Sequence, residues 1–213
     1  MVKGIMLRNA VQIIHKPKEA KIIVDPIRRE ILRQLNIRSQ TATQLAEKLN
    51  LTKSTVGHHV RVLRKARLIR IKLAKPGHHG ILEKYYEPVA ALFIGDHNRM
   101  SSDLRNYFLY IHMERLRGIF AAFQLLSESK KRTFKIPAEV DLLSELAKEI
   151  AKHITRIAER YENTETEMGA EDLFAKIYGE ALKTVMMKGI WRKVFADMNQ
   201  VGTLILKEQV SGP

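Results

Sequence analysis

Residues 52–69 combine short polar side chains with a later run of cations on one side of a predicted helix. Val56, Val60 and Leu63 recur at helical spacing and are expected to face a core. The opposite side carries small polar groups first and long cations later, which suits a helix whose first turns reach base edges in the major groove. We interpret this side as a DNA contact rather than a solvated helix surface, with Arg61 suited to either a guanine or a phosphate. Its residues are Lys53, Ser54, Gly57, His58, Arg61, Arg64 and Lys65.

A basic hairpin is predicted directly after this helix. Ile69, Ile71 and Leu73 alternate with cations, which predicts a strand, and a second strand is expected over residues 81–86. The turn over residues 75–80 contains glycine and can approach a DNA backbone or the minor groove closely. The alternative is an ordinary hairpin with solvated lysines. The candidate contacts of this wing are Lys72, Lys75, His78, His79 and Lys84.

The segment before the basic helix carries helix-start signals. Thr41 and Gln44 form a capping box ahead of a short amphipathic helix. Residues 50–51 make a tight turn, and Thr52 then starts the basic helix. Two short helices joined by a tight turn indicate a helix-turn-helix.

Three further elements are predicted upstream. Residues 10–14 are apolar and rich in β-branched side chains, which predicts a strand. A proline at residue 17 suits the first position of a short helix that runs through about Val24. Asp25 and Pro26 form a sharper start, a capping acid followed by a proline, for a helix that ends near Asn36.

Beyond residue 96 the chain is predicted to be almost entirely helical. Apolar residues at helical spacing mark one helix over about 104–123 and a second over about 143–161. Residues 130–137 separate these two helices, and the polar residues 163–169 are expected to form a loop. A third helix begins near Ala170.

This third helix, alone or with a fourth, is predicted to run toward residue 208, and Gly189 marks a candidate interruption. The predicted fold class is therefore mainly α with a small β-hairpin wing. Residues 1–95 form a winged helix-turn-helix DNA-binding domain. Residues 96–213 form an all-α region for dimerisation, with room for an effector of unknown identity.

The positive charge is concentrated in the first part of the chain. The net charge of the 213 residues is +14. Residues 1–95 hold 19 Lys and Arg against 6 Asp and Glu, whereas residues 96–213 hold 18 against 17. Because each phosphate contact releases condensed counterions, this distribution favours a polyanionic partner. A protein that is basic for general reasons would spread the charge more evenly.

Several function classes lack support. The absence of cysteine excludes disulfides, thiolate metal sites and cysteine nucleophiles. Phosphate-binding and dinucleotide glycine motifs and hydrolase signatures are absent, so we predict that the chain is not an enzyme. No apolar run approaches the ~18–20 residues of a membrane span, and no signal peptide is recognisable. We expect a soluble cytoplasmic protein with no membrane partner.

The histidines do not indicate a metal site. Adjacent residues on a helix diverge by about 100°, so His58 and His59 cannot chelate as a pair, and one should point outward and the other inward. His112 and His153 are isolated and expected to be structural. We predict no metal and no cofactor. A metal sensor that uses histidine and carboxylate ligands is the weaker alternative.

These residues resemble the ArsR-like winged-helix transcription regulators, most closely an archaeal subgroup. The resemblance rests on Asp25-Pro-Ile-Arg-Arg-Glu-Ile-Leu32, on Ser54-Thr-Val-x-His-His-Val-x-x-Leu63 and on the hairpin, and it covers about residues 10–95. It implies a homodimer whose third helices enter successive major grooves, with His59 in a structural role. By position it implies that Lys53, Ser54, Thr55, His58 and Arg61 form the DNA-facing part of that helix. Together with the helix and wing residues above, the predicted DNA-binding set is Thr52, Lys53, Ser54, Thr55, His58, Arg61, Arg64, Lys65, Lys72, Lys75, His78 and His79.

Three departures from the family pattern matter. Gly57 stands where serine is common, at a cost of about 1 kcal/mol relative to alanine inside a helix, so it either admits a close backbone approach or has no role. Arg67 stands where a glycine usually ends the helix, so the C-cap must be built otherwise and a further cation comes near the DNA backbone. The cysteine motif of the metal-sensing members is absent.

The expected function is sequence-specific binding of double-stranded DNA by a dimeric transcription regulator, a repressor by family habit. One alternative is an architectural or sequence-tolerant nucleic-acid-binding protein that uses charge without reading bases. A third hypothesis is an interaction module in which the winged helix contacts protein, and the basic first half argues against it.

Overall fold

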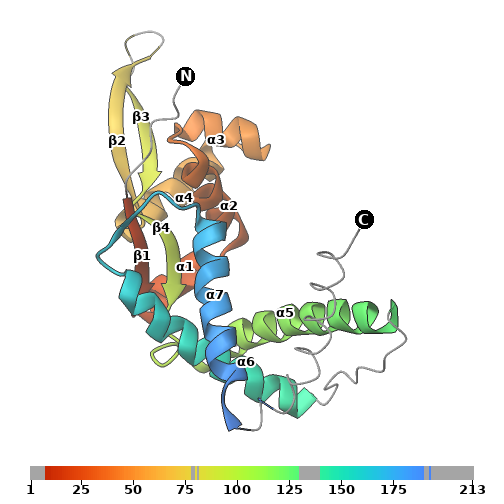
Figure 1. Cartoon of the computed structure of the whole chain (residues 1–213). Helices are drawn as coiled ribbons and strands as arrows, with labels where there is room; N and C mark the ends of the chain where they lie inside the picture. The colour runs from red at the N-terminus through yellow and green to blue at the C-terminus, as the bar shows by residue number, and fades with distance from the viewer. Residues whose placement is uncertain (1–7, 78–79, 81, 130–139, 190–191, 193–213) are drawn as a thin grey trace. The chain divides into compact units, whose positions relative to one another are not determined.

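The computed structural model describes residues 8–77, 80, 82–129, 140–189 and 192 (Figure 1). The chain divides into two compact units, Met1–Leu104 with Thr155–Ile177 and Arg105–Ile154 with Tyr178–Pro213. The elements in chain order are β1 (Arg8–Ile14), α1 (Pro17–Val24), α2 (Pro26–Ile37), α3 (Ala42–Leu49), α4 (Lys53–Lys65), β2 (Ile69–Pro76), β3 (Leu82–Pro88), β4 (Ala90–Gly95), α5 (Ser102–Ser129), α6 (Val140–Ala158), a 3-10 turn (Glu159–Tyr161), β5 (Glu165–Thr166) and α7 (Ala170–Met186).

The helix starts predicted from the sequence are confirmed. The Asp25 side chain accepts a hydrogen bond of 2.9 Å from the Arg28 N–H at the start of α2. Thr41 and Gln44 form both halves of the capping box of α3. The turn after α3 uses Asn50 in the left-handed region, with a φ of 52°. The mainly helical fold class with a β2–β3 hairpin after the helix-turn-helix is also confirmed.

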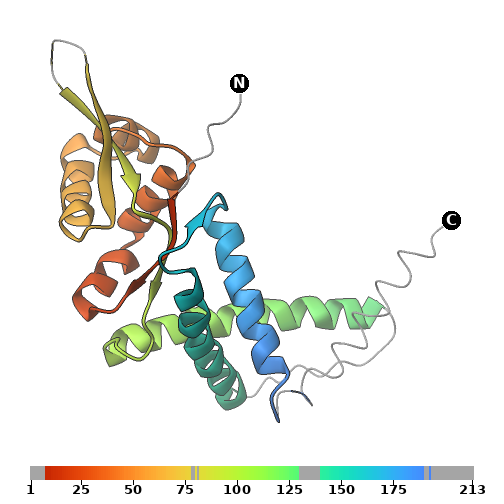
Figure 2. The same ribbon diagram turned by 60° about the vertical axis from the view of Figure 1, so that its left-hand side comes forward.

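Helices α2, α3 and α4 enclose the core of the first unit. Their inward sides are aliphatic, and burial of such side chains contributes about 1.5–3 kcal/mol each. Figure 2 shows the three helices grouped together, with the β2–β3 hairpin extending away from them. The most buried members of this core are Ile31, Leu35, Leu45, Val56, Val60, Leu63 and Leu68.

The hairpin is longer than predicted and contains an irregularity. Strands β2 and β3 pair antiparallel, with Ile71 opposite Tyr86 and Leu73 opposite Tyr85, so Lys72 is an extra residue in β2. A bulge of this kind interrupts the alternation of the strand. The predicted alternation of Ile69, Ile71 and Leu73 with cations is therefore interrupted between Ile71 and Leu73. Ile69 is buried and Ile71 is exposed.

A second sheet was not predicted. It has the order β4–β1–β5, with β1 and β4 parallel and β1 and β5 antiparallel. Strand β1 covers the predicted strand at residues 10–14. Strand β4 begins at Ala90, after the hairpin, and β5 lies in the predicted loop at residues 163–169. The apolar run over residues 90–94, bounded by Pro88 and Gly95, is the local signal for β4.

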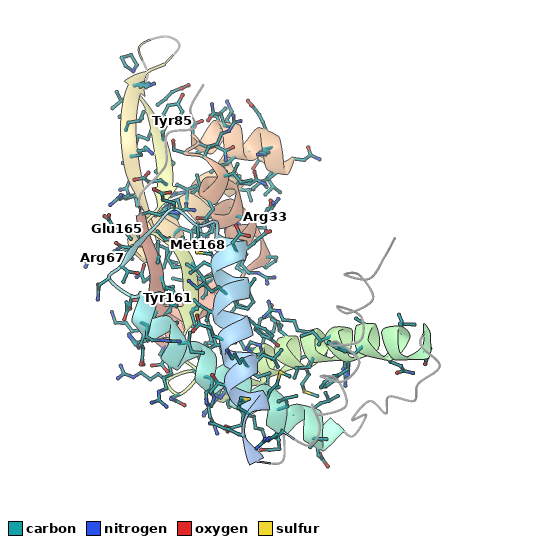
Figure 3. The ribbon with its side chains drawn as sticks, viewed as in Figure 1. Arg33, Arg67, Tyr85, Tyr161, Glu165 and Met168 are labelled. Atoms are coloured by element: carbon teal, nitrogen blue, oxygen red, sulfur yellow. The ribbon has the colours of Figure 1, made fainter. Side chains whose placement is uncertain are left out.

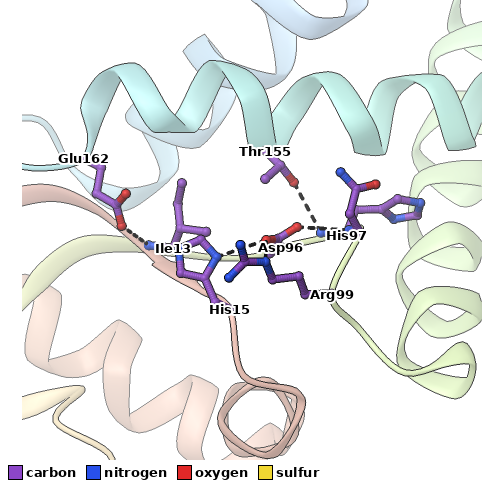
Figure 4. Close-up of polar contacts among 8 residues, drawn as sticks. Ile13, His15, Asp96, His97, Arg99, Thr155 and Glu162 are labelled. Carbon is purple, nitrogen blue, oxygen red and sulfur yellow. Dashed lines mark hydrogen bonds and ion pairs between the residues drawn. The ribbon is translucent and has the colours of Figure 1, made fainter.

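A polar cluster holds the ends of β1 and β4 together (Figure 4). The Asp96 carboxylate lies 3.0 Å from Nδ1 of His15 and 3.4 Å from Nε of Arg99, and it accepts from the Asn98 N–H at 3.0 Å. Burial alone would raise the pKa of Asp96, but these hydrogen bonds and the nearby positive charges hold it below its usual value. The cluster fixes the turn that leads from β4 toward α5.

The helical unit has its own apolar core. Its most buried side chains include Leu116, Phe120, Leu146 and Ile150. The ring of His112 stacks on Tyr178 with centroids 5.8 Å apart, and burial raises the pKa of Tyr178 to about 12. This placement of His112 matches the structural role expected for it.

The later helices match the predicted ones in order and approximate length. Helix α7 ends at Met186, and Gly189 has a φ of 34°. The predicted break over residues 130–137 and the predicted continuation toward residue 208 lie outside the described residues, apart from Arg192. No described helix is long and apolar enough to cross a membrane.

The division between the units differs from a boundary at residue 95. Residues 155–177 belong with the winged part, because β5 pairs with β1 and the Glu162 carboxylate accepts a hydrogen bond of 3.1 Å from the Ile13 N–H. The separation into a DNA-binding domain and an effector or dimerisation domain stays a prediction about function.

Candidate nucleic-acid interface

Helix α4 presents one polar side to solvent and one aliphatic side to the core. Its buried residues are Val56, Val60 and Leu63, as the spacing predicted. The exposed side begins with small polar groups and continues with cations, so the expected order is present in the folded helix. The exposed members are Thr52, Lys53, Ser54, His58, Arg61, Arg64 and Lys65, whereas Thr55 is half-buried.

The start of α4 is held by hydroxyl groups. Thr52 is the N-cap, and its Oγ1 accepts a hydrogen bond of 3.1 Å from the Thr55 N–H. The two threonine hydroxyls also lie 2.8 Å apart. These bonds satisfy orphan groups of the first turn. They stabilise the turn that carries Lys53 and Ser54.

The C-cap of α4 is built on Arg67, where the family usually has a glycine. Arg67 adopts a left-handed conformation with a φ of 57°. The Leu68 N–H donates to the Leu63 carbonyl and the Arg67 N–H to the Arg64 carbonyl, both at 3.0 Å. This is a Schellman motif, and it is built on an arginine whose left-handed backbone costs about 1–2 kcal/mol. The exposed Arg67 side chain adds a cation next to the end of α4 (Figure 3).

The two adjacent histidines divide as predicted. His58 is exposed, and His59 has a side chain only 12% exposed, with Nδ1 at 3.9 Å from Oδ1 of Asp25. Burial lowers the pKa of His59, against the opposing attraction of Asp25, and the charges of Arg28 and His58 add to the lowering. His59 therefore packs α4 against the start of α2 and is not placed to touch a partner.

Gly57 and Arg61 form a distinct feature on the exposed side. They lie one helical turn apart, and the exposed Arg61 donates from Nε to the Gly57 carbonyl at 3.1 Å. A side chain on a helix leans toward the N-terminus, so Arg61 reaches back along the helix toward the polar start.

The cations of α4 are available for an anionic partner. Among the described residues, no carboxylate lies within ion-pair distance of Lys53, Arg61, Arg64 or Lys65. An exposed helix side with four such cations attracts phosphate strongly.

The wing has a charge arrangement that the sequence did not predict. Glu87 on β3 has a side chain only 9% exposed, and its carboxylate lies 2.9 Å from Nε of Arg70 and 3.1 Å from Nζ of Lys72. Lys72, one of the predicted DNA contacts, thus forms an ion pair at the base of the hairpin. The sequence analysis did not single out Arg70, the other cation of this group. The register shift at Lys72 decides this pairing, and a register cannot be read from strand propensity alone.

The other predicted wing residues have different outcomes. Lys75 is exposed, with Nζ 6.0 Å from the ring centroid of Tyr85, and Lys84 is exposed. His78 and His79 lie outside the described residues. The DNA contacts assigned to the wing therefore remain predictions.

The described residues do not gather three or more histidine or carboxylate side chains in an arrangement able to hold a metal ion. His153 instead places Nδ1 at 2.8 Å from the Glu149 carbonyl and Nε2 at 2.9 Å from Nζ of Lys188. The donor set for metal chemistry is thus not brought together in the part that the structure describes.

A capped helix-turn-helix, a basic exposed helix and a two-stranded wing define a winged helix-turn-helix DNA-binding protein. Residues 25–70 match the family described as bacterial regulatory protein, arsR family. The matched range begins at the cap of α2 and ends in β2. The chain is a DNA-binding transcription regulator, and this family is one of regulators rather than enzymes.

A solved structure with detectable similarity is reduced HlyU from Vibrio cholerae N16961. It is 17% identical, with 43% of this chain and 79% of that chain covered and a TM-score of 0.27. No curated protein matches the sequence.

Proposed function

We propose that the chain is a sequence-specific, dimeric regulator that represses transcription. The observation that carries the proposal is the exposed side of α4, where hydroxyl donors at a capped N-terminus precede Arg61, Arg64 and Lys65. Such a helix start reaches base edges, while later cations meet phosphate. The arsR match over residues 25–70 supports a role at operators.

The dimer is proposed to form through the helical unit. Large apolar side chains are exposed there, with Tyr110 60% and Leu125 67% exposed on α5, and Met187 71% exposed just after α7. Exposed apolar side chains of this size are typical of surfaces that another protein covers. Pairing would bring two copies of α4 to one duplex.

The experiment is selection of bound duplexes from a random-sequence library by the purified full-length protein. A two-fold dimer predicts an inverted repeat with half-sites about one helical turn, ~34 Å, apart. Enrichment of no motif would favour an architectural, sequence-tolerant binder. A strict monomer on the selected duplex would remove the dimer from the proposal.

Repression is tested with the selected duplex placed over a promoter. The proposal predicts lower reporter transcription when the full-length protein is present. Higher transcription would identify an activator and leave DNA recognition intact.

A further inference from the structure

Gly57 lies in the interior of α4 without an internal reason to be glycine. Its φ is outside the left-handed region, and a Cβ built on it would meet no atom within 4 Å. Glycine inside a helix is less favourable than alanine, because it loses more backbone freedom on folding. Nothing in the described part of the chain therefore requires residue 57 to lack a side chain.

The surroundings of Gly57 indicate the kind of partner that would require it. Gly57 is half-buried and lies on the solvent-facing side of α4 with the exposed His58, the exposed Arg61 and the hydroxyls at the start of the helix. Positive charge and short donors suit a nucleic acid, and an uncovered stretch of main chain lets a base edge come closer to the helix than any side chain would allow.

Arg61 adds the chemistry of the contact. Its Nε–H donates to the Gly57 carbonyl at 3.1 Å, which holds the guanidinium beside Gly57. The N–H groups on its two terminal nitrogens remain for a partner. Two parallel donors on one arginine match O6 and N7 of guanine.

We propose that Gly57 is a point of close DNA approach and that it sets the position of a guanine read by Arg61. A base pair packs against the main chain at Gly57, and the guanine accepts two hydrogen bonds from Arg61. This inference rests on the proposed function, sequence-specific binding by α4, and it assigns Arg61 to a base rather than to a phosphate.

The substitution Gly57→Ala tests the approach with a single methyl group. Because that methyl meets nothing in the free protein, we expect the Tm to rise by about 2–4 °C from helix propensity. Affinity for the selected duplex should fall about tenfold or more, whereas affinity for random duplex at the same salt should change by less than about twofold.

Gly179→Ala is the matched control. Gly179 lies inside α7, away from the side of α5 proposed to pair two chains, it is exposed, and a Cβ there also meets nothing within 4 Å. It should give a similar rise in Tm and leave both DNA affinities unchanged. Equal discrimination between selected and random duplex by wild type and Gly57→Ala would overturn the inference.

Replacement of single guanines in the selected duplex by 7-deazaguanine tests whether Arg61 reads a guanine. At one position the replacement should weaken wild-type binding several-fold and have no further effect on Arg61→Ala. Additive losses at every guanine would overturn the assignment of Arg61. A wild-type protein that does not discriminate selected from random duplex would instead contradict the proposed function itself.

Discussion

Arg67 serves two purposes at one position. Its backbone, with a φ of 57°, closes the end of α4, and its side chain is an exposed cation beside that end. A glycine would supply the backbone conformation without strain, but it would carry no charge. We infer that the strained cap is tolerated because the cation contributes to DNA binding.

Substitution of Arg67 by asparagine separates the two purposes. Asparagine accepts the left-handed region, so the free energy of unfolding should change by less than about 0.5 kcal/mol, whereas Arg67→Val should lose about 1–2 kcal/mol. If Arg67 contacts phosphate, Arg67→Asn should lower the salt dependence of DNA binding by about one unit of slope. Urea unfolding and binding titrations at several salt concentrations measure both effects. An unchanged slope would contradict a phosphate contact.

His59 makes stability depend on pH. Burial lowers the pKa of His59 in the folded state, so below about pH 6.5 the unfolded chain takes up the proton more readily. The contribution of the neutral His59 side chain to stability is fully present above that pH. It is lost as the pH falls toward the lowered pKa of the folded state, at no more than about 1.4 kcal/mol per pH unit. Between pH 7.5 and 5.5, the free energy of unfolding measured with urea should therefore fall less for His59→Gln than for wild type. His58→Gln is the control, and an equal change of slope in both variants would contradict this account.

Among the elements, the β2–β3 hairpin contains a carboxylate that neutralises part of its own positive charge. Glu87 holds Arg70 and Lys72 at its base through contacts of 2.9 and 3.1 Å. Those contacts reduce the positive charge that the wing presents. They also join Lys72, the extra residue of the bulge, to the opposite strand.

Substitution of Glu87 by glutamine should release both cations. We expect the free energy of unfolding to fall by about 1–2 kcal/mol, since a largely buried carboxylate and its ion pairs are lost. Affinity for random duplex at low salt should rise, with a steeper salt dependence. Glu83→Gln removes the same charge from an exposed site on the same strand. If both variants bind random duplex equally, release of Arg70 and Lys72 has no effect on binding.

Helix starts were readable from the sequence because their signals are local. Asp25 with Pro26, Thr41 with Gln44, and Thr52 each cap a helix through residues at most three positions away. The parallel pairing of β1 with β4 was not readable, since it joins segments about 80 residues apart. The same limit explains why the Lys72–Glu87 pair was missed: it depends on register.

At the scale of the whole molecule, the chain combines a basic winged unit with a helical unit that exposes apolar side chains. The basic excess of residues 1–95 supplies attraction to DNA that does not depend on sequence. In the proposed dimer, discrimination between sequences comes from α4 and from the simultaneous placement of two copies on one duplex. Sequence-specific binding would then depend on association of two chains as well as on α4.

A charge on α5 tests this association. If the exposed side of α5 pairs two chains, Tyr110→Glu should shift the protein from dimer to monomer in sedimentation experiments, because burial of an unpaired carboxylate is strongly unfavourable. Ile37→Glu is the matched control, since Ile37 is 62% exposed at the end of α2 and lies in the winged unit. A dimer that survives Tyr110→Glu would exclude this side of α5 as the interface.

Base reading by α4 is decided by the ratio of affinities for the selected duplex and for random duplex, measured by competition at one fixed salt concentration. A transcription regulator that reads bases through α4 should prefer the selected duplex by about 10³ or more, and Arg61→Ala should reduce the free-energy difference between the two duplexes by about 1–3 kcal/mol. Equal affinity for the two duplexes would contradict base reading by α4.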